Sequence, residues 1–203
     1  MQIGVVDYGA SNIFSVLRAV SHLGAKAKVI SKQEDLKSID KIILPGQGSM
    51  GACIENLKKK NLFESLKLSL SEKPYLGICL GLQVLFSLSE ESIDSEGMNI
   101  FSGKVERFTE NEIFKITHMG WNQVVFKKKH FVNKNIPNSS NFYFVHSYAS
   151  KELKKDNILA ETTHGELFNS AVIQDNIIGV QFHPEKSGAQ GLKFLENFIN
   201  WKI

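Results

Sequence analysis

Short apolar runs alternate with segments of helical spacing along the first half of the chain. Four of the runs have the length and apolar content of buried strands, and they cover residues 3–6, 26–30, 41–44 and 75–78. Apolar residues at helical spacing occur in 12–23, 57–70 and 80–88, and Gly24 is a natural stop for the first of these helices. This alternation predicts a parallel sheet with right-handed crossovers and helices on both faces.

The second half has a different pattern, because its apolar runs follow one another without long helices between them. Strands are expected over residues 104–108, 123–126, 142–145, 158–163, 170–174 and 177–182, and a last helix over 188–201. The sequence therefore predicts an α/β fold whose mostly parallel central sheet carries an antiparallel extension. No linker rich in Pro, Gly or Ser separates the two halves, so one domain is expected over residues 1–203.

Composition and charge narrow the class of protein. The 24 Lys and Arg residues nearly balance the 21 Asp and Glu residues, and a net charge of +3 does not favour a nucleic-acid partner. The longest apolar stretch, residues 75–86, is interrupted by glycine and glutamine and is too short to cross a membrane. The amino terminus lacks the basic region and cleavage site of a secretory signal. With only Cys53 and Cys79, no disulfide framework is expected, and we predict a cytoplasmic protein.

The strongest chemical signal lies in residues 75–83, where a strand is followed by Gly-x-Cys-x-Gly and then by a helix. This is the nucleophile-elbow pattern with Cys79 at the position of the nucleophile. The two glycines permit the sharp turn, because larger residues would clash there. The sulfur would lie at a helix N-terminus, which favours the thiolate and offers the Leu80 N–H to an oxyanion. A buried inert cysteine is the stronger alternative for the motif alone, and it is the interpretation for Cys53.

A cysteine that attacks a carbonyl group needs a proton carrier, which is usually a histidine held by a third group. His183 stands out because it follows a buried strand in the run Gln-Phe-His-Pro-Glu. In extended backbone His183 and Glu185 would project side by side, with Pro184 stiffening the segment. The carboxylate would hold one ring nitrogen while the other faces Cys79. A surface histidine before a helix is the alternative for this tripeptide alone, and His146 is a weaker alternative base.

A second group of amides is expected in the loop Leu44-Pro-Gly-Gln-Gly48 after the third strand. Its proline and glycines favour a tight turn whose N–H groups point outward together, as the binding of an oxyanion requires. An ordinary strand-to-helix turn is the alternative for this motif alone. No pair of Cys or His residues has metal-ligand spacing, so a metal site is disfavoured, and no cofactor is expected.

Taken together, these motifs resemble the class I glutamine amidotransferases nearly from end to end. The resemblance is carried by Val5-Val-Asp-Tyr-Gly9, Leu44-Pro-Gly-Gln-Gly48, Leu76-Gly-Ile-Cys-Leu-Gly-Leu-Gln83, His118-Met-Gly-Trp-Asn122, Val145-His-Ser-Tyr148 and Gly179-Val-Gln-Phe-His-Pro-Glu-Lys-Ser187. The cysteine elbow and the Gln-Phe-His-Pro-Glu run are shared across the class. The His-Met-Gly-Trp-Asn run is similar to the glutaminase subunits of imidazole glycerol phosphate synthase in particular.

The resemblance implies a catalytic triad of Cys79, His183 and Glu185, in which the thiol attacks the carboxamide of glutamine. It also implies an oxyanion loop at Gly46 and Gln47, glutamine contacts at Gln83, Ser147 and Tyr148, and a partner interface at His118, Met119, Gly120, Trp121 and Asn122. Ammonia would pass to a HisF-like (β/α)₈ cyclase or synthase subunit without entering bulk solvent. The implied function is glutamine hydrolysis for histidine biosynthesis.

The chain departs from the family pattern at Gln47, Met50, Thr117 and Ala149, where family members usually carry Val, Phe, Pro and an aromatic residue. The first departure keeps the backbone N–H but bears on how readily the oxyanion loop changes conformation. Two other functions stay open: a paralogous subunit that feeds an amidino-sugar synthase, and a stand-alone thiol hydrolase of γ-glutamyl bonds. The intact triad conflicts with a non-catalytic regulatory subunit.

Overall fold

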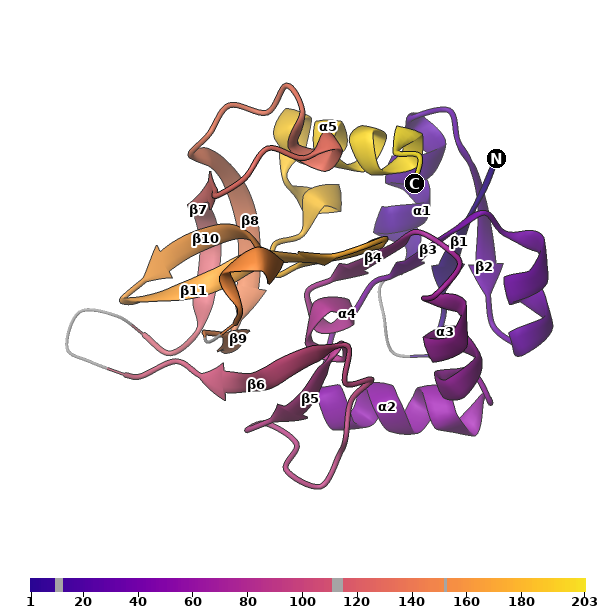
Figure 1. Ribbon diagram of the computed structural model, residues 1–203, viewed down its shortest axis with the longest axis horizontal. Coiled ribbons are helices and arrows are strands. Elements are labelled where there is room, and N and C mark those ends of the chain that lie inside the picture. Colours follow the sequence, from indigo (N-terminus) through magenta and orange to yellow (C-terminus); the bar gives the residue numbers. More distant parts are fainter. Residues whose placement is uncertain (10–12, 111–114, 152) are drawn as a thin grey trace.

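The structure of the protein is a computed structural model, which describes residues 1–9, 13–110, 115–151 and 153–203. The parallel strands are β1 (Gln2–Val6), β2 (Lys26–Ile30), β3 (Lys41–Leu44), β4 (Tyr75–Ile78) and β12 (Ile177–Val180). The antiparallel strands are β11 (Glu166–Gln174), β10 (Ile158–His164), β7 (His118–Phe126) and β8 (Ser140–His146). In the described residues they form one sheet in the order β2-β1-β3-β4-β12-β11-β10-β7-β8 (Figure 1). The predicted parallel sheet with an antiparallel extension is confirmed.

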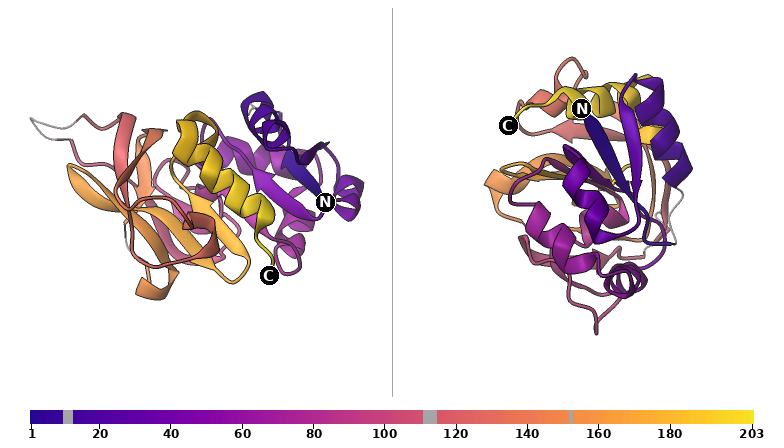
Figure 2. Two further views of the ribbon diagram at one scale, coloured as in Figure 1. Left: turned by 90° about the horizontal axis from the view of Figure 1, so that it is seen from above. Right: turned by 90° about the vertical axis from the view of Figure 1, so that its right-hand side faces the viewer.

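Helices cover both faces of the parallel strands, as the strand–helix alternation predicted (Figures 1 and 2). The helices α1 (Ile13–His22) and α5 (Gly188–Asn200) contribute to one core cluster, and α2 (Met50–Lys59) and α3 (Phe63–Ser69) contribute to the other. Alternation along β1 serves both clusters, because Val5 belongs to the first and Val6 to the second. The two apolar faces of the sheet therefore hold the helices that flank the site.

A smaller sheet corrects one prediction. Only the first turn of the expected helix over 80–88 forms, as α4 (Leu80–Gln83), and the chain then enters β5 (Phe86–Ser89). This strand pairs with β6 (Phe101–Arg107), which also pairs with β9 (Tyr148–Ser150). The carbonyl of Leu85 accepts the N–H groups of Ile100 and Phe101 instead of a helical partner. A continuous buried apolar run carries no period that separates a helix from a strand.

Smaller differences concern where elements begin and end. The helical region expected over 57–70 is two helices, because Asn61 adopts a left-handed φ of 56° between them, and α2 starts early at the N-cap Ser49. Gly24 ends α1 with a φ of 76°, as expected, whereas Asn12 lies outside the described residues. The short helices are η1 (Gln33–Ser38), η2 (Phe131–Asn133), η3 (Lys155–Asn157) and η4 (Pro184–Lys186).

Candidate active site

Cys79 stands between β4 and α4, where the parallel strands end. Its backbone angles, φ 53° and ψ −101°, lie where residues that carry a side chain are rarely found. Both neighbouring glycines are needed for this turn. A Cβ atom on Gly77 would clash with the Gly81 carbonyl, and one on Gly81 would clash with the Leu44 carbonyl. The structure thus contains the strained elbow that the motif predicted.

Cys79 is buried, with an exposed fraction of 8%. The buried Gln181 donates an Nε2–H to its sulfur at 3.4 Å, and the Val145 carbonyl lies 3.9 Å away. Since α4 is a single turn, the helix dipole invoked from the sequence is small, and a side-chain donor is directed at the sulfur instead.

His183 and Glu185 form a buried pair in which ring Nδ1 and carboxylate Oε1 are 2.8 Å apart. The expected extended backbone between them is wrong, because residues 184–186 form the short helix η4. The fixed φ of Pro184 suits the first position of a helix. The pair nevertheless forms, and Ser187 Oγ secures the turn by donating to the His183 carbonyl at 2.5 Å.

The charge on His183 follows from its two neighbours. Burial alone would lower its pKa, but the Cys79 sulfur and the Glu185 carboxylate outweigh burial and raise the pKa to about 10. His183 Nε2 is buried and makes no hydrogen bond within the described residues, although the nearby Cys79 sulfur raises the pKa of the ring. The imidazolium therefore keeps one N–H free for a reacting group.

The loop between β3 and α2 packs directly on the elbow, because a Cβ atom on Gly46 would clash with the Leu80 side chain. Its next residue is held by Tyr8: the Gln47 N–H donates to the Tyr8 hydroxyl, which in turn lies 3.1 Å from the Gln47 carbonyl. The Leu80 N–H makes no hydrogen bond among the described residues. Of the three residues expected at the oxyanion site, Leu80 therefore has a free N–H, Gln47 has an engaged one, and Gly46 lines the cavity. Tyr8 was not anticipated from the sequence.

A cavity of about 250 Å³ unites these groups. It is lined by Gly46, Gln47, Gly48, Cys79, Leu80, Gln83, Glu91, Val145, His146, Ser147, Tyr148 and His183. Eight of the residues were expected in the site, and the volume suits a molecule smaller than a drug. A larger hollow of about 750 Å³ on residues 126–138 contains neither the thiol nor its base. The smaller cavity is therefore the candidate active site.

Glu91 is the acidic residue that the sequence did not reveal. Its carboxylate accepts the Met50 N–H at 3.1 Å, and burial raises its pKa while this bond opposes the rise. It follows β5, a strand that the sequence did not predict, and no motif marks it.

Comparison with known proteins agrees with this geometry. The model of the glutamine amidotransferase class-I family matches residues 4–201. The chain is 42% identical to imidazole glycerol phosphate synthase subunit HisH of Hydrogenovibrio crunogenus, over 97% of this chain and 95% of the relative. It is 43% identical to the subunit of the same name from Methanocaldococcus jannaschii, over 97% and 98%. The chain belongs to the HisH family of class-I glutamine amidotransferases.

HisH membership makes the protein an enzyme, as its motifs predicted, with glutamine amidotransferase as its class. Solved structures agree in fold. The structure of PurLQS from Thermotoga maritima superimposes with a TM-score of 0.77 at 19% identity, covering 98% of this chain and 97% of that chain. A crystal structure of a glutamine amidotransferase gives a TM-score of 0.75 at 19% identity, over 97% and 98%.

In this HisH family member the residues expected to contact glutamine are linked to one another. Gln83 donates its Nε2–H to the Tyr148 carbonyl at 3.0 Å, and it lies 3.3 Å from the Gln181 side chain. Ser147 Oγ is 3.0 Å from Thr117 Oγ1, so one departure from the family pattern supplies a hydroxyl here. Ala149, another departure, is fully buried in β9.

The residues expected at the partner interface alternate along β7. Met119 and Trp121 are 70% and 58% exposed, whereas His118 is 4% exposed. Asn122 also faces inward, where its Nδ2 lies 3.0 Å from His118 Nε2. Gly120 has a φ of 130°, which other residues rarely adopt. Only alternate residues of the motif are therefore presented to a partner on this face.

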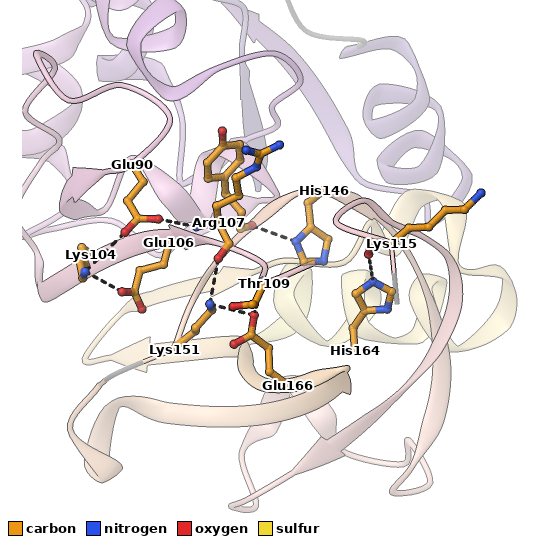
Figure 3. A network of polar contacts seen from close by, with 11 residues as sticks. Glu90, Lys104, Glu106, Arg107, Thr109, Lys115, His146, Lys151, His164 and Glu166 are labelled. Carbon is orange, nitrogen blue, oxygen red and sulfur yellow. Dashed lines mark hydrogen bonds and ion pairs between the residues drawn. The ribbon is translucent and has the colours of Figure 1, made fainter. Parts of the chain in front are cut away.

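Ion pairs brace the strand that carries Tyr148 (Figure 3). Lys151 Nζ lies 2.9 Å from Glu166 Oε1 and donates to the Arg107 carbonyl at 2.9 Å. These contacts tie the small sheet to β11. Among the described residues, no three His, Cys, Asp or Glu side chains form a metal-binding cluster. None of the described helices has the length and apolar character needed to cross a membrane.

Proposed function

We propose that this protein is the glutaminase subunit of imidazole glycerol phosphate synthase and that Cys79 is its nucleophile. One observation carries the proposal: the strained thiol of Cys79 and the ring of His183, which Glu185 holds at Nδ1, line a single small cavity. Backbone strain at a nucleophile persists only where the surrounding structure enforces it.

The proposed reaction has two halves. The Cys79 thiolate attacks the carboxamide carbon of glutamine, and the C–N bond breaks as His183 Nε2 gives its proton to the departing nitrogen. Ammonia leaves, and a γ-glutamyl thioester remains on the sulfur. The neutral imidazole then takes a proton from water, whose oxygen attacks the thioester, and the C–S bond breaks. Glutamine and water thus yield glutamate and ammonia, while Glu185 Oε1 stays on Nδ1 and keeps Nε2 directed at the reaction.

The cavity offers partners for the charged end of glutamine. Its α-ammonium group requires an acceptor, and Glu91 is the carboxylate that lines the cavity. Gln83 and the backbone of Ser147 and Tyr148 line the same wall and would contact the remaining polar atoms of the amino acid.

The tetrahedral intermediate needs donors for its oxyanion. The free N–H of Leu80 supplies one. The N–H of Gln47 supplies the second once this peptide turns away from the Tyr8 hydroxyl, and glycines on both sides of Gln47 permit the rotation. Hydrolysis in the isolated subunit would therefore be slow, and a partner that favours the turned loop would accelerate it.

The expected partner is a (β/α)₈ cyclase subunit that receives ammonia within a heterodimer. Support comes from the exposed apolar side chains of Met119 and Trp121 on β7, which stand beside strand β8 and its cavity-lining Val145. Both cysteines are free thiols, which suits a cytoplasmic enzyme.

Reconstitution with the cyclase subunit from the same organism tests the function. Wild-type protein should support formation of imidazole glycerol phosphate from either glutamine or added ammonia. Cys79→Ala should lose the glutamine-dependent reaction and keep the ammonia-dependent one, whereas Cys53→Ala, at the other thiol, should keep both. Full glutamine turnover by the chain alone, with no complex formed, would overturn the proposal and favour a stand-alone hydrolase.

A further inference from the structure

Two buried histidines lie beside the active site without a place in the proposed reaction. His118 on β7 and His146 on β8 are cross-strand partners and are 4% and 7% exposed. Phe108, Phe144 and Phe168 surround them: Phe144 stacks on His118 at 4.5 Å between ring centroids, and Phe168 meets the His146 ring at 5.2 Å. Polar rings in such an apolar environment need hydrogen bonds to one another or to the backbone, because a buried polar group without a partner is costly.

The hydrogen bonds determine which nitrogen of each ring carries the proton. A carbonyl can only accept, so His146 Nδ1, 2.9 Å from the Tyr148 oxygen, must be the donor. His146 Nε2 is then the acceptor for His118 Nδ1–H at 3.0 Å. His118 Nε2 in turn accepts from Asn122 Nδ2 at 3.0 Å. The amide of Asn122 is itself oriented, because its Nδ2 also donates to the Thr163 carbonyl and its Oδ1 accepts the next backbone N–H.

Both rings are neutral in this arrangement. Burial lowers the pKa of His146 to about 3, against the opposing effect of the Tyr148 carbonyl, and the neighbouring imidazoles lower it further. Burial, together with His164, lowers the pKa of His118 to about 4. At neutral pH each ring therefore has one donor and one acceptor, and reversing either ring would set two acceptors against each other.

The inner end of this chain is a carbonyl of the site. The Tyr148 oxygen accepts from His146 and also from Gln83 Nε2, and all three residues line the cavity (the dashed line from His146 in Figure 3 marks the first bond). The outer end is Asn122 on β7, the strand that exposes Met119 and Trp121.

We propose that Asn122, His118 and His146 act as one hydrogen-bonded positioning unit that holds the Tyr148 carbonyl, and through it the Gln83 amide, in place for glutamine. His118 and Asn122 touch no reacting atom, so their role is exerted through His146. The inference rests on the proposed glutaminase function. A protein docked on β7 contacts the strand that carries two of the three members.

A pair of substitutions at His118 tests the unit. His118→Phe keeps the aromatic packing and removes the donor to His146, whereas His118→Asn retains an amide N–H near the position of Nδ1. Loss of this hydrogen bond should raise KM for glutamine ~10-fold, the equivalent of ~1.4 kcal/mol, with kcat changed less than about twofold. In His118→Asn, KM for glutamine should stay close to the wild-type value, because the amide N–H replaces most of the lost hydrogen bond. His164→Phe, the same change in a ring stacked on His118 at 4.3 Å, should leave KM unaltered.

A spectroscopic measurement on the full chain reads the same unit without any turnover. In ¹⁵N NMR spectra, wild-type His146 should show a protonated Nδ1 and an unprotonated Nε2. In His118→Phe, Nδ1 should stay protonated on the Tyr148 carbonyl, whereas the Nε2 chemical shift should change because this acceptor loses its donor. Glutamine turnover by wild type tests the proposed function separately. Equal KM values for wild type and His118→Phe, or equal increases in His118→Phe and His118→Asn, would overturn the inference. If His118→Phe does not fold, Asn122→Ala at a half-exposed position takes its place, and an unchanged KM together with an unchanged His118 Nε2 chemical shift would overturn the inference.

Discussion

Acid should destabilise this protein through the same two buried histidines. In the folded state the pKa values of His146 and His118 are lowered to about 3 and about 4, whereas an unfolded chain titrates near the ordinary value of 6.5. Both groups are therefore neutral in the folded protein and become protonated on unfolding below pH 6.5. Their stabilising contribution is complete above pH 6.5 and is lost as the pH falls toward the folded-state values.

The loss of stability between pH 7 and pH 5 can be calculated for each ring. One pKa unit corresponds to 1.36 kcal/mol, so the enclosed His146 should account for ~2 kcal/mol of the free energy of unfolding. For His118, whose pKa is lowered less than that of His146, we expect a smaller loss of ~1 kcal/mol. His183, whose folded-state pKa is raised to about 10, acts in the opposite direction: its contribution is complete below 6.5 and is lost as the pH rises toward 10. Between pH 7 and pH 5, the contribution of His183 to the free energy of unfolding rises by less than ~1 kcal/mol.

Urea denaturation at pH 7, 6 and 5 measures the effect, and variants isolate it from the titration of carboxyl groups. His146→Asn should lose ~2 kcal/mol less than wild type between pH 7 and pH 5, and His118→Asn ~1 kcal/mol less. His22→Asn, at an exposed position near the end of α1, should behave as wild type. Parallel loss of stability in all four proteins would refute the reasoning, because it would mean that the buried rings do not differ in protonation between the folded and unfolded states.

Three further predictions concern the reaction. Glu185→Gln should fold normally and slow glutamine hydrolysis on the order of 10⁴-fold, as loss of the orienting carboxylate does in a serine-protease triad. Steady-state turnover near the wild-type rate would mean that another group orients His183. Tyr8→Phe removes the hydroxyl that accepts the Gln47 N–H. Since such a hydrogen bond contributes ~1 kcal/mol, hydrolysis by the subunit without its partner should rise ~5-fold. A fall in rate would show that the contact favours the conformation of the Gln47 loop that binds the oxyanion. The pH–rate profile should stay high through neutral pH and decline as the pH approaches 10, where the raised pKa predicts that His183 loses its proton; a decline centred near 6.5 would contradict the coupling to Cys79 and Glu185.

Much of the fold could be predicted because its signals are local. The four parallel strands of the first half and the stop at Gly24 depend on residue type and spacing over a few positions. The expected helix over 80–88 failed for a non-local reason: the backbone of Val84 and Leu85 pairs with residues 98–101, and an apolar run alone does not reveal such a partner. The turn at Pro184 was misjudged because the extended and helical alternatives share the same proline-compatible φ.

The elbow around Cys79 and the identity of its base were determined by the sequence itself. A strained turn requires glycines at fixed offsets, and a proton carrier requires a histidine with an acidic neighbour, so both leave marks in a single chain. Tertiary structure alone decided that Glu91 enters the cavity, that Tyr8 engages the Gln47 peptide and that His118 faces His146. These contacts join residues 28 to 41 positions apart, and Glu91 follows a strand that the local pattern did not predict. The reason is physical: residue spacing specifies backbone conformation over one or two turns, whereas the direction of a buried hydrogen bond depends on strands that pair only when the whole sheet assembles.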